Sequence, residues 1–174
     1  MKRIVLQVVV IFLFLFVSSS LVDSDLVFSE SMVQDEEFDE VKKVISERGV
    51  SGECLNRLSE IYSRVGSDLR DVLIDMHYIE SRYDSLAVSF SGDYGIGQIN
   101  PRWWGGNQLK EFLEDIGLSE ELSFYDVVYS AENCILYSEW ILRKFLEKSN
   151  GDLRLALRLY NGSWAYADKV LGLK

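Results

Sequence analysis

Glu80 stands at the end of an apolar stripe, where a carboxyl group can carry out acid chemistry. Before it, apolar residues recur at the spacing of one face of an α-helix: Leu69, Val72, Leu73, Met76 and Ile79. Glu80 continues this face, four positions beyond Met76. Partial removal from water disfavours the charged form of a carboxyl and raises its pKa, which keeps the group protonated for general acid catalysis near neutral pH. The alternative interpretation is a helix end that simply reaches solvent.

Three stretches follow one another in a recognisable order from Glu80 onwards. The first runs from Glu80-Ser81 through Ala87, Ser89 and Gly92 to Gly95-Ile96-Gly97-Gln98-Ile99-Asn100-Pro101. The others are residues 131–142 and the segment Ala156-Leu157-Arg158-Leu159-Tyr160-Asn161-Gly162. Together they resemble the soluble lytic transglycosylase family of the lysozyme-like superfamily, over residues 68–174. Three ordered motifs are more specific than one short motif. The chain departs from the family pattern at Asp93, Asn100 and Tyr137.

The resemblance implies a mainly helical, α+β lysozyme-like domain with a small β-hairpin or loop region beside the catalytic glutamate. It also implies a peptidoglycan substrate and a route with one acid. Glu80 would protonate the β-1,4 glycosidic oxygen between N-acetylmuramic acid and N-acetylglucosamine. The same group, now a carboxylate, would take the proton from the muramyl 6-hydroxyl, which closes on C1 to give a 1,6-anhydro end. No cofactor and no metal are implied.

The resemblance assigns five residues to the substrate side of the site. Ser89 and Gln98 would hold the sugars near the cleaved bond, and Asn100 belongs to the same substrate-binding set. Tyr160 and Asn161 would orient Glu80 and the substrate. From the residues alone, Ser89 and Gln98 could instead stabilise their own loop, and Tyr160 could be a core residue.

Two other functions remain open at this point. A hydrolytic muramidase or chitinase needs a second carboxylate, for which Asp93 or Asp84 is available. The third reading is a weakly catalytic, peptidoglycan-binding component of an envelope-spanning machine. The end group of the product separates the first two, and any turnover separates both from the third.

Aromatic residues near the motifs could line a groove for sugars, because a flat indole packs well on the apolar face of a pyranose. Trp103 and Trp104 follow the Gln98 loop, and Trp164 follows Asn161. Packing of the loop against the body of the domain explains Trp103 and Trp104 equally well. Trp140, on the predicted long helix, is expected in the core.

Composition excludes several classes of function. The 174 residues are 48% hydrophobic, which suffices for one domain with a core, and the net charge is −10. Eight acidic residues and no basic one lie in residues 23–40. Nucleic acid is therefore an unsuitable partner, since phosphate binding needs a clustered basic surface. His77 is the only histidine, which argues against a histidine-based zinc site and most histidine-dependent nucleophiles.

The N-terminus has the pattern of an export signal. Lys2 and Arg3 precede an apolar run over residues 4–17, and small residues, Ser18 to Ser20, follow. Extended to residue 22, the run is also long enough for a retained membrane anchor. We therefore expect a signal peptide or signal anchor over residues 1–22 and an acidic spacer over 23–40. The domain, over 41–174, is expected outside the cytoplasm, in the periplasm, in the cell envelope or secreted.

Helical periodicity dominates the rest of the chain. Helices are expected at residues 38–47, 53–65 and 131–148. A further helix should contain the apolar stripe that ends at Glu80, with Ser67 or Asp68 as its N-cap. Asp152 should cap the helix that follows it. Residues 83–101 are expected to form a loop or small hairpin. Cys54 and Cys134 each fall on a helix face expected to be buried. They form either a disulfide, as export permits, or two buried free thiols.

Overall fold

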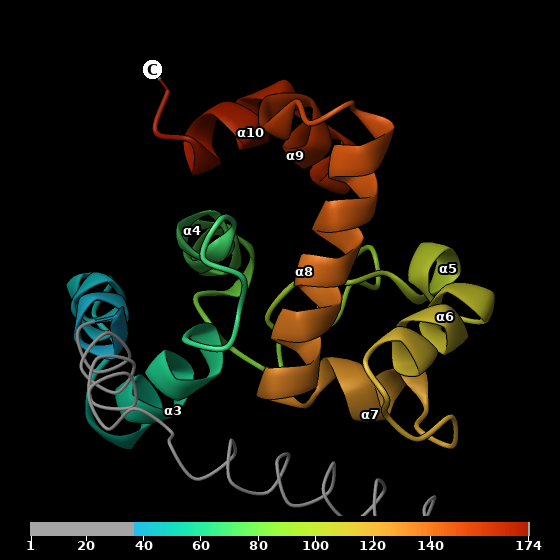
Figure 1. Cartoon of the computed structure of the whole chain (residues 1–174), viewed down its shortest axis with the longest axis horizontal. Coiled ribbons are helices and arrows are strands. Elements are labelled where there is room, and N and C mark those ends of the chain that lie inside the picture. Colours follow the sequence, from blue (N-terminus) through green and yellow to red (C-terminus); the bar gives the residue numbers. More distant parts are fainter. Residues whose placement is uncertain (1–36, 174) are drawn as a thin grey trace, which may run out of the picture. The chain divides into compact units, whose positions relative to one another are not determined.

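The computed structural model describes residues 37–173, which are mainly helical. The chain divides into two units, with the second beginning at Val41. In that unit residues 41–47 are helical, and eight further helices follow (Figure 1). They are α3 (Gly52–Tyr62), α4 (Arg70–Ser81), α5 (Pro101–Trp104), α6 (Asn107–Asp115), α7 (Phe124–Val128), α8 (Ala131–Lys148), α9 (Leu153–Asn161) and α10 (Trp164–Val170).

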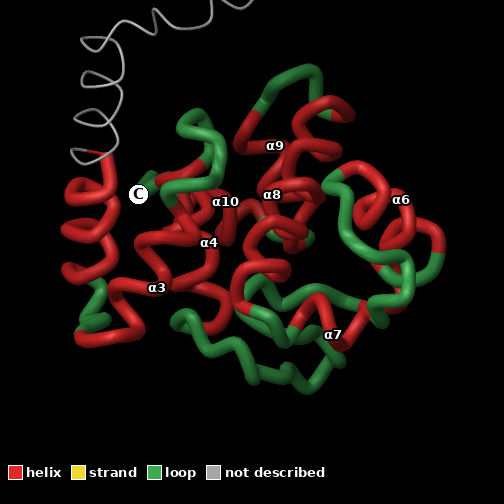
Figure 2. Tube along the Cα trace, turned by 60° about the horizontal axis from the view of Figure 1, so that its bottom comes forward, coloured by secondary structure: helices red, strands yellow, loops and turns green. Residues whose placement is uncertain are grey.

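Helix α8 is the central element of this unit. In Figure 1 it lies between α3 and α4 on one side and α5 and α6 on the other, and Figure 2 again shows it between α4 and α6. It begins at the predicted residue because the Ser130 side chain accepts a hydrogen bond from the Asn133 amide, and it ends at Lys148 as expected. Its buried face consists of Cys134, Ile135, Tyr137, Ser138, Ile141 and Leu142.

Helix α4 carries Glu80 on its last turn. The apolar stripe predicted for this helix is buried at Leu73 and Met76, together with Ile74. The expected caps are wrong: the residue at the N-cap is Leu69, which has no side-chain capping bond. Asp68 instead pairs with Arg143 of α8, at 2.9 Å.

The loop after α4 contains little β-structure. Two isolated antiparallel bridges, Val88 with Tyr94 and Tyr94 with Ile99, are its only β-contacts in the described range. The expected loop or small hairpin is therefore present, without a regular strand. The Ser81 hydroxyl donates a bond of 2.9 Å to the Ile96 carbonyl oxygen, which holds this loop against the end of α4.

Two glycines let the loop approach the end of α7 and the middle of α8 closely. Gly95 has a φ of +71°, and a Cβ atom there would collide with the Val128 carbonyl oxygen. A Cβ atom on Gly97 would collide with the Ser138 hydroxyl of α8. The absence of side chains at these two positions therefore permits the loop to pack directly on α7 and α8.

The predicted N-terminal segments lie largely outside the described residues. This applies to the signal peptide or anchor over 1–22 and to the acidic spacer up to residue 36. Residues 37–40, the last four of the expected spacer, are helical. Within residues 37–173, no helix is long and apolar enough to cross a membrane.

Candidate active site

The Glu80 carboxyl is partly withdrawn from water, where α4 meets α10 and the end of α9. Burial raises its pKa, and the negative charge of Asp93 acts in the same direction. The neighbouring Tyr166 hydroxyl, the Asn161 amide and the positive charge of Lys169 oppose this, but the net shift is upward. Glu80, predicted from the apolar stripe to be a desolvated acid, therefore holds its proton to a higher pH than a carboxyl in water does.

Asn161 connects Glu80 to the C-terminal helices. Its Nδ2 donates a hydrogen bond of 3.2 Å to Glu80 Oε1. Asn161 is the last residue of α9, and Gly162 follows it with a φ of +88°, the left-handed conformation that ends many helices. The turn leads directly into α10, where the Ser163 hydroxyl accepts a bond from the Tyr166 amide.

Tyr166 is a site residue that the sequence pattern did not reveal. Its hydroxyl lies beside the Glu80 carboxyl and is buried without a hydrogen bond of normal geometry to any group in residues 37–173. Burial raises its pKa far above the usual range, and the nearby charge of Glu80 adds to the effect. No motif includes this residue, because only the fold brings α10 against α4.

Tyr160 joins α9 to the loop after α4. Its hydroxyl donates a bond of 2.8 Å to the Gly97 carbonyl oxygen and lies 3.4 Å from the Ser138 hydroxyl. The side chain therefore fixes the position of the loop relative to α9, the helix that carries Asn161. Tyr160 is held at the site in this way, with its ring also packed against the core.

Asp93 lies in a network of hydrogen bonds within its loop. The hydroxyls of Ser89 and Ser91 donate to Oδ2 at 2.7 and 2.6 Å, and Asn100 Nδ2 donates to Oδ1 at 2.7 Å. Partial burial alone would raise the pKa of Asp93, but these donors outweigh it and the pKa is lowered. Asp93 therefore stays ionised where Glu80 favours its protonated form.

The remaining loop residues have contacts of their own. Gln98 Nε2 donates to the Gly95 carbonyl oxygen at 2.9 Å, and Gln98 has a φ of +48°. Together with the bonds of Ser89 and Asn100 to Asp93, this means that all three predicted sugar-binding side chains stabilise their loop in the structure. Asp84, the other candidate second carboxylate, is exposed and accepts a bond from the Leu86 amide at 2.9 Å.

A cavity of about 460 Å³ lies next to Asn161. Trp103, Trp104, Gln108, Phe145, Leu159, Tyr160, Asn161 and Gly162 line it. Trp103 is 66% exposed and has the Arg102 guanidinium over its ring, whereas Trp104 packs edge-on against Trp140 and Phe145. The cavity therefore combines aromatic surface with the residue that binds Glu80. Trp164 lies outside it, beneath the guanidinium groups of Arg154 and Arg158.

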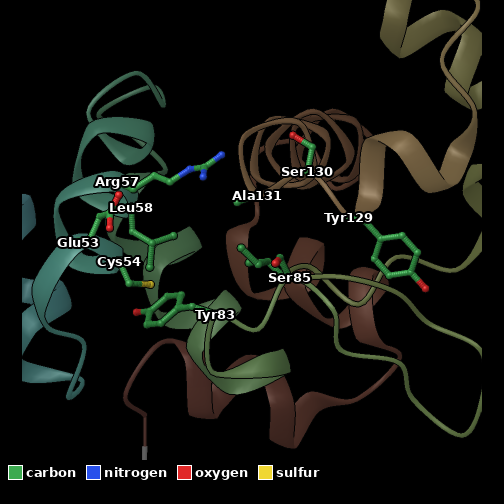
Figure 3. A pocket seen from close by; sticks show the side chains of 10 residues that line it. Glu53, Cys54, Arg57, Leu58, Tyr83, Ser85, Tyr129, Ser130 and Ala131 are labelled. Atoms are coloured by element: carbon green, nitrogen blue, oxygen red, sulfur yellow. The ribbon is translucent and has the colours of Figure 1, made fainter.

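A second cavity, of about 420 Å³, is shown in Figure 3. Its lining comes from α3, from the loop after α4 and from the start of α8. Glu80 lines neither cavity, but this second one also lacks Asn161, the residue that binds Glu80, so we assign it no part in the acid chemistry. Cys54 on α3 lines this cavity and is exposed, contrary to the expected buried position. Cys134 is buried on α8, and the structure has both thiols free rather than joined in a disulfide.

His77, three residues before Glu80 on α4, is fully buried. Its Nδ1 lies 2.7 Å from the Tyr62 hydroxyl, while Nε2 has no hydrogen-bond partner in the described part of the chain. Burial lowers the pKa of His77 to about 3, so it is neutral at physiological pH. Among the described residues, no cluster of histidine, cysteine or acidic side chains could hold a metal ion.

Comparisons with known proteins do not assign the chain to a family. No protein-family model, no curated protein and no solved structure matches the chain.

Proposed function

We propose that this chain is a peptidoglycan lytic transglycosylase with a lysozyme-like catalytic domain, in which Glu80 serves first as general acid and then as general base. One observation supports this most directly. The Glu80 carboxyl has a raised pKa and accepts a hydrogen bond from Asn161, which also lines the aromatic cavity. A protonated acid that is connected through Asn161 to a cavity with an exposed indole suits the cleavage of a bond between sugars.

The proposed reaction consumes no water. Glu80 donates its proton to the glycosidic oxygen as the bond from this oxygen to C1 of N-acetylmuramic acid breaks, and N-acetylglucosamine leaves with a free 4-hydroxyl. The Glu80 carboxylate then takes the proton of the muramyl 6-hydroxyl, whose oxygen bonds to C1. The acid is regenerated, and the muramyl product carries a 1,6-anhydro ring.

The proposed substrate places the protein outside the cytoplasm. The export pattern of residues 1–22 supports this, either through a cleaved signal peptide or through a retained anchor. Peptidoglycan glycan strands are then the partner of the cavity side of the domain.

A hydrolytic muramidase is the second candidate, because Asp93 supports it specifically. Asp93 remains ionised, and its charge acts on Glu80. Two carboxyl groups whose environments move their pKa values apart are typical of an acid paired with a base or an electrostatic stabiliser. Asp84 has no comparable influence on Glu80, so Asp93 is the second carboxylate of this alternative.

Mass spectrometry of the products distinguishes these functions. The full-length protein is incubated with purified sacculi, and the released fragments are analysed. A lytic transglycosylase yields 1,6-anhydro-muramyl ends, each lighter by one water than the reducing ends that a hydrolase yields.

Glu80→Gln, which keeps the volume but removes the transferable proton, should abolish release of fragments. The matched control is Glu114→Gln, the same change at an exposed position of α6, which should release fragments as the unaltered protein does. Undiminished release by Glu80→Gln would refute the assignment of the acid. Absence of any turnover by the unaltered protein would favour a binding component instead.

A further inference from the structure

The Tyr166 hydroxyl is buried but makes no hydrogen bond of normal geometry in the described part of the chain. Most buried polar groups are hydrogen-bonded, since an unpaired one has lost its contacts with water without replacement. This hydroxyl is close enough to Glu80 to lower the pKa of that carboxyl, although it is not aligned for a normal hydrogen bond to it.

The carboxylate form of Glu80 has few hydrogen-bond donors around it. Asn161 Nδ2 supplies one hydrogen bond, to Oε1. A carboxylate can accept about four hydrogen bonds, whereas a protonated carboxyl donates one and needs fewer donors. The titratable or charged groups that act electrostatically with Glu80 lie on the loop, α9 and α10: Asp93, Tyr160, Tyr166 and Lys169.

Among these groups, Tyr166 is the one suited to donate to the carboxylate. The Tyr160 hydroxyl already donates to the Gly97 carbonyl oxygen, and Asp93, when ionised, has no proton to donate. Lys169 is exposed and acts on Glu80 through its charge. Because burial keeps Tyr166 in its neutral form, its hydroxyl retains a proton to donate.

We propose that Tyr166 is a positioning residue for Glu80: its hydroxyl forms a hydrogen bond to the Glu80 carboxylate once the proton has left. Hydrogen bonds at catalytic groups are often poorly aligned in the free enzyme and tighten as the reaction proceeds. The interaction would hold the carboxylate in place for its second task as a base. Its timing in the reaction rests on the proposed function, but the interaction between the two side chains does not.

Tyr166→Phe tests this inference because it removes only the hydroxyl. Without this donor the carboxylate form of Glu80 loses stabilisation, so the pKa of Glu80 should move upward. The carboxyl carbon resonance of Glu80 reports the shift in an NMR titration of the full-length protein, and its absence in Glu80→Gln assigns the signal. This measurement does not depend on any enzymatic activity.

Turnover on sacculi should show a matching change. Well below the pKa of Glu80, kcat should fall by about tenfold, because the carboxylate that forms during proton transfer is stabilised less. At higher pH the deficit should narrow, since the variant keeps more of its acid protonated. KM should not change. A defect in folding alone would lower kcat equally at all pH values.

Tyr83→Phe is the matched control. Tyr83 is buried like Tyr166, but its hydroxyl donates to the Ile74 carbonyl oxygen at 3.1 Å. Its removal should lower the melting temperature and leave the pKa of Glu80 unchanged. At pH values below the pKa of Glu80, Tyr166→Phe should leave the melting temperature equal or raise it, because its hydroxyl makes no hydrogen bond of normal geometry there.

The outcomes separate this inference from the proposed function. An unchanged pKa of Glu80 in Tyr166→Phe would overturn the inference, whatever the activity. Strong destabilisation of Tyr166→Phe at pH values below the pKa of Glu80 would also overturn it, because the hydroxyl would then be a structural group. If the pKa rises but no sacculi are digested by the unaltered protein, the proposed function fails while the interaction between Tyr166 and Glu80 stands.

Discussion

The Tyr160 hydroxyl donates a hydrogen bond to the Gly97 carbonyl oxygen at 2.8 Å, joining residues that are 63 positions apart in the sequence. Gly97 lies in the loop after α4, and Tyr160 lies next to Asn161 at the end of α9. The same loop carries Asp93, whose charge acts on Glu80. One hydrogen bond therefore links two of the segments whose residues act on the Glu80 carboxyl.

The raised pKa of Glu80 predicts how Glu80→Gln affects stability. A carboxyl whose pKa is higher in the folded than in the unfolded state contributes most to stability below its unfolded pKa, and this contribution is lost as pH rises through the folded pKa. Glu80→Gln should therefore be more stable than the unaltered protein near neutral pH, and this gain should vanish in acid. Thermal unfolding between pH 4 and pH 8 measures it. A gain of equal size at every pH would contradict the role of ionisation.

Asp93→Asn should lower the pKa of Glu80, because it removes a negative charge that raises this pKa. Activity that requires protonated Glu80 should then decline at lower pH than in the unaltered protein. A transglycosylase should keep most of its turnover at its new optimum, since no second acid is needed. Loss of turnover at every pH, in a folded protein that forms reducing ends, would instead establish the hydrolase. Asp84→Asn is the control and should leave the pH profile unchanged.

The glycine pair predicts two different outcomes of substitution. Gly97→Ala should destabilise the fold by about 1–3 kcal/mol, because the new methyl group meets the Ser138 hydroxyl. Adding Ser138→Gly should restore part of the loss. Gly95→Ala should be worse, since its obstacle is the Val128 backbone and its φ is positive. Ser138→Gly should not rescue it. Urea unfolding of the four variants checks this, and equal rescue of both substitutions would refute the assigned contacts.

The two cysteines should differ in reactivity. Cys54 is exposed, whereas Cys134 is buried and its thiol has a pKa raised to about 11 by burial. In the folded protein an alkylating reagent should modify Cys54 and spare Cys134, and both should react after unfolding without reductant. If neither reacts under these denaturing conditions, a disulfide is present and the arrangement of α3 and α8 differs from the one described.

The sequence predicts those elements that carry a strong local signal. Helix α8 begins and ends where expected, because Ser130 caps a long apolar periodicity. Asp152 caps α9 as predicted, by accepting a bond from the Leu155 amide. Helices α5, α6 and α7 were not anticipated. Helix α6, for example, begins after Gly106 without a side-chain capping bond. Its apolar residues are buried by packing on the core, which the local sequence does not indicate.

In the candidate site, too, the sequence predicts the features with a local signal but not those that depend on packing. The position of Glu80 on an apolar helix face predicts a desolvated acid, and the raised pKa of Glu80 agrees with that interpretation. The roles of Tyr166 and Ser91 cannot be predicted from the sequence. Tyr166 reaches Glu80 only because α10 folds back onto α4, and Ser91 acts through the carboxylate of Asp93. Such contacts depend on tertiary packing and leave no periodic signal.

The span of 81 positions between Glu80 and Asn161 also has a consequence for biosynthesis. A ribosome that makes this chain completes α4 long before it reaches α9 and α10, which supply Asn161 and Tyr166. Until these two helices emerge and fold, the Glu80 carboxyl lacks the contacts with Asn161 and Tyr166. A chain cut before α9 would therefore carry the glutamate without these partners, so the proposed acid chemistry requires α9 and α10 to be in place.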